Sequence, residues 1–159
     1  MKNVAIFFGI GCGGLAVLAV VGTFAYFTVV GTIGPDTSVY TGNRVPARFV
    51  TTVKDLGLLE EDEKIVWFYS DALTDIRSGL YFATEDKLVL YSKNWDTPEN
   101  IIPLQEITAV QAAYDDSFFE DSEFFITTRS KEEYSFPLSS DNGLDKRFVE
   151  WIEKKIPDR

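Results

Sequence analysis

The side chains able to do acid–base chemistry in this sequence are almost all carboxylates. The chain has 25 Asp and Glu residues, no histidine and one cysteine, Cys12. Without histidine there is no His-dependent triad, histidine metal site or histidine proton shuttle, and one cysteine makes neither a disulfide framework nor a multi-cysteine zinc site. Paired carboxylates can act as acid and base, but none here stands in a recognisable motif. We therefore expect no enzymatic activity, no cofactor and no bound metal.

Two polar segments carry aromatic side chains. Residues 115–123 hold five carboxylates around Phe118 and Phe119, which suits a cation, a basic partner, or a solvated hairpin loop that two aromatics anchor. Trp95 lies in the polar segment 93–98, where it would contact a membrane interface or a partner protein, or else fold back over a sheet edge. Trp95, Phe118 and Phe119 are therefore the candidate partner contacts.

The overall charge limits the class of partner. The net charge is −10, which argues against a nucleic-acid binder, because such proteins need a basic surface to displace counterions. Lys2 is one of the 15 basic residues and all 25 acidic residues follow it, so residues 36–159 carry a net charge of −11.

Charged side chains are absent from residues 3–35. An uncharged apolar stretch of about 18 or more residues is typical of a transmembrane helix. As a helix, residues 4–30 would measure about 40 Å, enough to cross a hydrocarbon core of about 30 Å with some tilt. We predict a single-pass, uncleaved anchor over residues 1–33.

A cleaved signal peptide is the main alternative. Its apolar part would run for only about 7–15 residues and end at small residues, whereas this run continues through Phe24, Tyr26 and Phe27. A lipoprotein anchored at Cys12 would lack the bulky residue usual three positions earlier. Basic residues flank the run about equally, and Lys54 slightly favours a cytoplasmic location for the domain that follows.

Ala5, Gly9 and Gly13 recur at four-residue spacing within the run. Small residues on one face let two membrane helices approach closely, so this face is a candidate for homodimerisation. The alternative is that glycine is simply common in membrane helices.

The rest of the chain divides by pattern. Gly34 and Pro35 end the apolar run, and residues 34–45 are predicted to be a flexible tether. Residues 46–57 are predicted to form a short helix, because their apolar residues share one helical face. Residues 58–159 are predicted to form the folded domain.

Within that domain, short apolar runs separated by polar breaks favour antiparallel hairpins. The expected strands cover residues 65–69, 80–83, 88–91, 107–113, 124–128 and 134–138. Pro103 is expected at an edge or a bend. Leu144, Phe148, Trp151, Ile152 and Ile156 then form an amphipathic helical stripe with Trp151 in the core and Ser140 or Asp141 as the helix cap.

This order of elements, short strands followed by one C-terminal helix, resembles a pleckstrin-homology (PH) domain. Residues 80–91 (LYFATEDKLVLY) are similar to the strand–turn–strand of bacterial PH-like and GRAM-like domains. Residues 102–107 (IPLQEI) resemble their IPL-x-x-I run, and residues 148–152 (FVEWI) resemble their closing helix. The resemblance covers roughly residues 60–156. It implies an α+β domain with a bent, nearly orthogonal β-sandwich or barrel that the helix closes, following the transmembrane α-helix.

The resemblance also implies a phosphoinositide or headgroup site, but the residues argue against one. A phosphate cradle needs clustered Lys and Arg or a glycine-rich loop, and the first hairpin loop, residues 70–78, sets Arg77 against Asp71 and Asp75. We therefore predict a non-enzymatic module, integral to the membrane, that binds a protein partner near the bilayer, itself a membrane protein. The alternative is a module that contacts lipid.

Overall fold

The computed structural model describes residues 38–115 and 121–156. Met1–Gly34 and Pro35–Arg159 are separate units of the chain, and all the described residues belong to the second. The predicted anchor over residues 1–33 lies outside the described residues, and so do Ala5, Gly9 and Gly13. Among the residues that the structure describes, no helix has the length and apolar character needed to cross a membrane.

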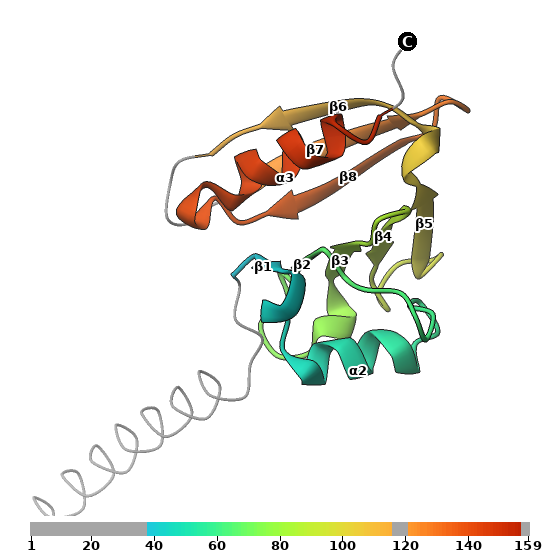
Figure 1. Cartoon of the computed structure of the whole chain (residues 1–159), viewed down its shortest axis with the longest axis vertical. Helices are drawn as coiled ribbons and strands as arrows, with labels where there is room; N and C mark the ends of the chain where they lie inside the picture. Colours follow the sequence, from blue (N-terminus) through green and yellow to red (C-terminus); the bar gives the residue numbers. More distant parts are fainter. Residues whose placement is uncertain (1–37, 116–120, 157–159) are drawn as a thin grey trace, which may run out of the picture. The chain divides into compact units, whose positions relative to one another are not determined.

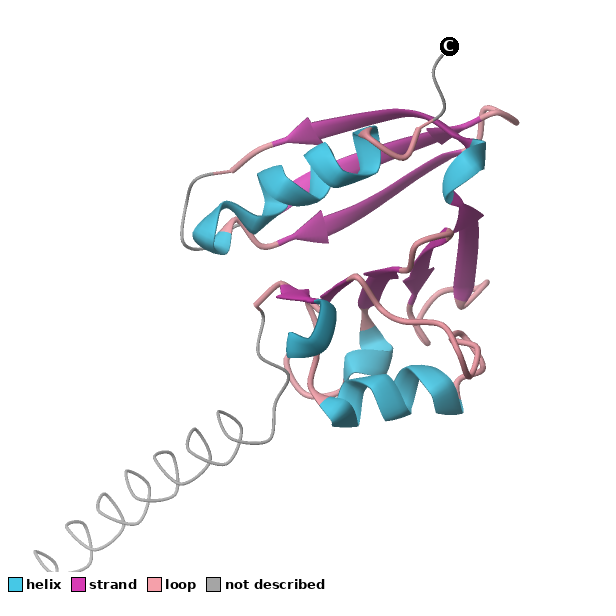
Figure 2. Cartoon of the chain, viewed as in Figure 1, coloured by secondary structure: helices cyan, strands magenta, loops and turns pink. Residues whose placement is uncertain are grey.

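Two antiparallel sheets and two α-helices make up the described part (Figures 1 and 2). The elements follow one another as β1 (Tyr40–Thr41), η1 (Gly42–Arg44), α2 (Ala47–Asp55), β2 (Trp67–Tyr69), η2 (Ile76–Ser78), β3 (Leu80–Ala83), β4 (Lys87–Tyr91), β5 (Glu99–Pro103), η3 (Leu104–Glu106), β6 (Ile107–Ala113), β7 (Ser122–Thr128), β8 (Glu133–Leu138), η4 (Asp141–Gly143) and α3 (Leu144–Glu153).

The first sheet has the order β1-β2-β3-β4-β5, and the second has the order β6-β7-β8. Within each sheet every strand pairs with its sequence neighbour, as in the pairs Phe68↔Phe82 and Phe124↔Phe136. The register of β6 against β7 shifts between Ile107 and Ala109. Pro103 lies in the edge strand β5, opposite Lys87, as expected of a residue that cannot donate to a ladder. Among the strands of the described residues, the sequence does not predict β1 and β5.

The first sheet is buried on both faces. Trp67 and Tyr69 of β2 face a core that includes the second sheet and α3, whereas Phe68 between them faces a second core that includes α2. The same alternation continues along β3 and β4. This explains why these strands are continuously apolar instead of alternating between polar and apolar residues.

Helix α3 closes the first of these cores. Figure 1 shows it lying along the three-stranded sheet. Phe148 and Ile152 are 2% and 0% exposed, so they lie at the centre of the predicted stripe. Trp151 was predicted to be core, but it is only partly buried and packs at the margin of the cluster.

The start of α3 differs from the prediction. Neither Ser140 nor Asp141 caps it with a side chain. Gly143 occupies the cap position with a φ of 63°, and Asn142 before it has a φ of 58°. This left-handed turn, which Asn and Gly adopt most easily, directs the chain into the helix and replaces the capping side chain.

Helix α2 lies inside the range 46–57 in which the sequence predicts a helix. It buries Phe49 and Val53 against the outer face of the first sheet. The amide of Gly57 donates to the Lys54 carbonyl at 2.9 Å, which ends the helix.

The segment predicted as a tether, residues 34–45, needs correction in its second half. Tyr40 and Thr41 form β1, which pairs with β2, and the Gly42 amide donates to the Val66 carbonyl at 2.8 Å. Val39 and Val45 are 5% and 8% exposed. Their burial fixes this segment to the domain, an effect that a segment of mostly small and polar residues does not reveal.

Candidate functional site

Two loops meet at one end of the first sheet. The loop between β2 and β3 and the loop between β4 and β5 are joined by backbone and hydroxyl bonds. The Lys93 amide donates to the Arg77 carbonyl at 2.8 Å, and the Ser92 hydroxyl donates to the Ser78 carbonyl at 2.6 Å. Both loops are therefore held in a defined position relative to each other.

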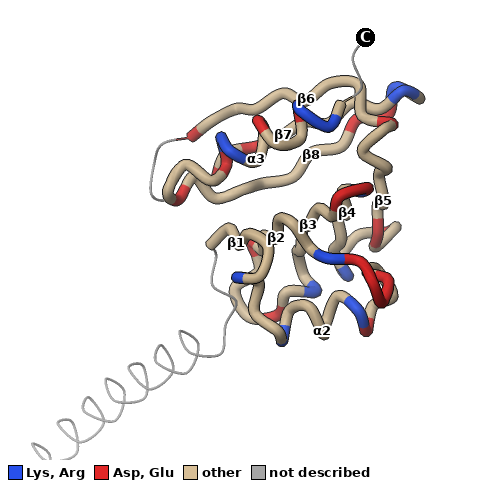
Figure 3. Tube along the Cα trace, viewed as in Figure 1, with Lys and Arg blue, Asp and Glu red and all other residues tan. Residues whose placement is uncertain are grey.

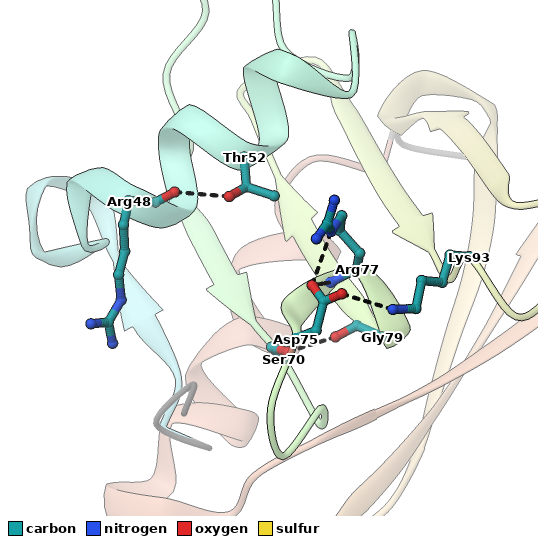
Figure 4. A network of polar contacts seen from close by, with 7 residues as sticks. All are labelled: Arg48, Thr52, Ser70, Asp75, Arg77, Gly79 and Lys93. Atoms are coloured by element: carbon teal, nitrogen blue, oxygen red, sulfur yellow. Dashed lines mark hydrogen bonds and ion pairs between the residues drawn. The ribbon is translucent and has the colours of Figure 1, made fainter. Parts of the chain in front are cut away.

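Asp75 is the charged centre of these two loops (Figure 4). Its carboxylate accepts from Lys93 Nζ at 2.7 Å, from Arg77 Nε at 3.0 Å and from the Arg77 amide at 3.1 Å. The hydrogen bond from Lys93, with that from Arg77, lowers the pKa of Asp75 to about 2. A carboxylate thus already occupies the place that an anionic headgroup would take between these two cations, in agreement with the argument against a phosphate cradle.

Asp75→Asn will remove the two ion pairs and keep the capping oxygen. Because the folded pKa of Asp75 is depressed from 3.8, its carboxylate stabilises the fold above about pH 4, and this stabilisation is lost as the pH falls through about 2. We expect the variant to be less stable by up to about 1 kcal/mol at pH 7, since the pairs are solvent-exposed. Urea unfolding between pH 7 and pH 2 measures it. A constant difference across that range would contradict the assignment.

The base of the β2–β3 loop is tightly packed. The Ser70 hydroxyl donates to the Gly79 carbonyl at 2.6 Å (Figure 4). A Cβ atom on Gly79 would lie 1.9 Å from Asp71 Oδ1, so only glycine leaves room for that carboxylate. Burial raises the pKa of Asp71, although the hydroxyl of Tyr81 donates to it at 3.3 Å. This packing makes the loop a rigid support, and no ligand is needed to explain it.

Each of the two loops also exposes an apolar side chain. Leu73, in the β2–β3 loop, is 74% exposed, and Trp95, in the β4–β5 loop, is 37% exposed. The structure thus leaves the predicted contact residue Trp95 accessible. Phe118 and Phe119, the other two predicted contacts, lie outside the described residues.

A groove of about 870 Å³ lies beside β1. We call it the β1 groove. Its lining comes from β1, η1, α2, the segment 59–67, the β3–β4 turn and α3. Since α2 and α3 cover opposite faces of the first sheet, the groove follows the edge of the sheet from one face to the other.

Aromatic and aliphatic side chains form most of the groove surface. The rings of Trp67 and Trp151 lie with their centroids 6.5 Å apart, and the ammonium of Lys155 lies 5.7 Å from the centroid of Trp151. Val50 and Leu59 contribute from the α2 side. A volume of this size is typical of ligand sites.

The charges around the β1 groove are unevenly balanced. Its two carboxylates are already paired, Glu63 with Lys87 at 2.8 Å and Glu85 with Lys155. Burial opposes ionisation of Glu63, but the bond from Lys87 lowers its pKa overall.

Three cations, Lys54, Lys64 and Arg147, also line the groove. Within residues 38–115 and 121–156, none of them forms an ion pair with a carboxylate. Figure 3 shows that basic positions are otherwise scattered along helices and loops. The groove therefore combines an apolar floor with an excess of positive charge, on a chain whose net charge is −10.

Sequence reasoning did not find the β1 groove. The one relevant pattern in the sequence is Trp151 on an amphipathic helical stripe, and this pattern was interpreted as core packing alone. The neighbouring Arg147 falls on the same helix one turn earlier, which is the pattern of a helix margin that borders solvent.

Comparisons with known proteins identify the fold. No known family profile and no curated protein matches the sequence. The structure is similar to a DUF1696 family protein with a pleckstrin-homology domain from Shewanella loihica PV-4, with a TM-score of 0.50 and 15% identity over 75% of this chain and 97% of that one. A pleckstrin-homology domain from Shewanella amazonensis SB2B has a TM-score of 0.47 and 17% identity, over 69% of this chain and 96% of that one.

The first of these similarities supports a PH-like fold. The predicted antiparallel sheets with a C-terminal helix are therefore confirmed for the second unit. At this level of identity the likeness concerns the fold alone.

Proposed function

We propose that the chain is a non-enzymatic, single-pass membrane module whose PH-like domain binds a protein partner near the bilayer. The observation that carries the proposal is the β1 groove, which is apolar, accessible and large enough for several side chains. Apolar concavities with a few charged groups are typical of recognition sites.

The uncharged run over residues 3–35 supports the anchor. The residues between the predicted anchor and β1, 34–39, extend at most about 20 Å. A partner in contact with the domain would therefore be close to the membrane, which favours another membrane protein. We place the domain on the cytoplasmic side, because Lys54 adds to the positive charge on the C-terminal flank of the predicted anchor. The face formed by Ala5, Gly9 and Gly13 remains the candidate homodimer contact.

A photo-reactive phenylalanine in place of Val50, which lines the β1 groove, tests this function in native membranes. We expect a discrete cross-linked protein, because a groove that binds a partner brings it within contact distance. The matched control carries the same group in place of Phe125, a half-exposed apolar residue of β7 outside the groove. Equal cross-linking at both positions, or none at either, would contradict the proposal.

A second function, lipid contact, is favoured by Leu73 and Trp95 on the two joined loops. Such side chains insert into membrane interfaces, but the net charge of −11 over residues 36–159 opposes an anionic surface.

Co-sedimentation of residues 36–159 with anionic liposomes at low salt measures this contact. We expect weak binding, and we expect Asp75→Asn to strengthen it by freeing Arg77 and Lys93. Micromolar binding by the unchanged domain, lost on Trp95→Ala, together with no cross-link from position 50, would reverse the ranking of the two functions.

A further inference from the structure

We propose that the β1 groove recognises an acidic protein segment that carries a large apolar side chain among its carboxylates. The inference rests on the proposed protein-binding function and adds the chemistry of the partner.

The apolar part of the partner follows from the floor of the groove. Val50 and Val66 line the groove and are only partly buried, so they present apolar surface above the buried Val45, Leu59 and Ile65. Trp67 is 7% exposed, while Trp151 is only partly buried and presents part of its ring at the margin. Side chains such as Phe or Leu gain most by leaving water for a surface of this kind.

The acidic part follows from the charges. Glu63 and Glu85 are neutralised by Lys87 and Lys155, and neither of these carboxylates pairs with the three groove cations. A carboxylate brought between Lys54, Lys64 and Arg147 is therefore attracted by three cations that form no ion pair with a carboxylate within the described residues.

The position of the cations favours an extended segment over a single anion. Lys54 is on α2, Arg147 is on α3, and these helices cover opposite faces of the first sheet. Lys64 lies between them in the segment 59–67. A segment with carboxylates on both sides of its apolar residue would meet cations on both walls, whereas one isolated charge would meet only one wall.

Binding of labelled peptides to the full-length protein tests the inference. The probe is a short peptide with a central Phe-Leu pair flanked by glutamates. One control peptide has lysines in place of the glutamates, and the other has serines in place of Phe-Leu. Fluorescence anisotropy gives the affinity. We expect the acidic apolar peptide to bind at least about tenfold more tightly than either control.

The matching protein variants are Arg147→Glu and Lys64→Glu, both exposed positions. Each should weaken binding of the acidic peptide by about tenfold or more. Arg129→Glu is the charge-matched control, since this arginine is 59% exposed and lies outside the groove. Circular dichroism verifies that each variant is folded.

Equal affinity for the glutamate and lysine peptides would overturn the inference, and so would unchanged binding in both groove variants. A groove cross-link from position 50 without any peptide binding would overturn it and leave the proposed function standing. Self-association of the protein that Arg147→Glu abolishes would assign the groove to a second copy and would also overturn it.

Discussion

Phe148→Ala will lower the free energy of unfolding by about 3–5 kcal/mol, as truncation of a buried aromatic does. Phe148 is 2% exposed, and its ring lies 5.6 Å from that of Trp67 and 5.9 Å from those of Phe124 and Phe136. These neighbours come from the first sheet and the second sheet, so Phe148 on α3 packs against both. Guanidinium unfolding of the full-length protein, followed by circular dichroism, measures the loss.

Phe125→Ala is the matched control for that measurement. Phe125 follows Phe124 in β7 but is 41% exposed, so its truncation should cost less than about 1 kcal/mol. Trp151→Ala should fall between the two, because Trp151 is partly buried. If Phe148→Ala costs no more than Phe125→Ala, α3 does not close the core.

Deletion of residues 1–33 will release the chain from the membrane fraction. Fourteen of residues 4–30 are Val, Ile, Leu or Phe. At mid-bilayer they favour insertion by about 4–8 kcal/mol, an upper bound, which corresponds to a partition ratio of at most about a thousandfold to a millionfold. We expect the full chain to stay in the pellet after carbonate extraction and the shortened chain to appear in the supernatant.

Leu18→Arg is the point-substitution counterpart, with an expected cost of about 2.5–3.5 kcal/mol at the helix centre, and Leu18→Ile is its neutral control. A full-length chain that carbonate extracts completely would contradict the anchor. An intact mass whose N-terminus falls within or just after residues 3–35 would instead identify a cleaved signal peptide.

The strands that the sequence predicts well are those with enough buried apolar residues to form a recognisable apolar run. The apolar runs match β3 and β6 in full, and β2, β4, β7 and β8 within two residues. β5 was missed because an edge strand needs fewer apolar residues, and Glu99, Asn100 and Pro103 are typical of a loop. β1 was missed because two residues carry no periodicity.

The Asp75 cluster and the β1 groove could not be predicted, for a different reason. Asp75 and Arg77 are neighbours in sequence, but Lys93 reaches them from another hairpin. The β1 groove likewise joins Lys54, Lys64 and Arg147 from segments far apart in the chain. Spacing in the sequence identifies only residues that lie close together along the chain. A site that the fold assembles from distant segments therefore leaves no pattern in the sequence.

The place of β1 in the chain bears on how the domain responds to mechanical load. β1 is the first described strand and lies at the edge of its sheet, paired with β2 at Tyr40 and Thr41 alone. Tension applied through the preceding residues would separate these two residue pairs before it loads any strand that pairs with two neighbouring strands. Detachment of residues 38–45 adds about 25 Å of chain. Thr41, Gly42, Asn43 and Val45 of this segment line the β1 groove, so its detachment would remove one wall of the groove.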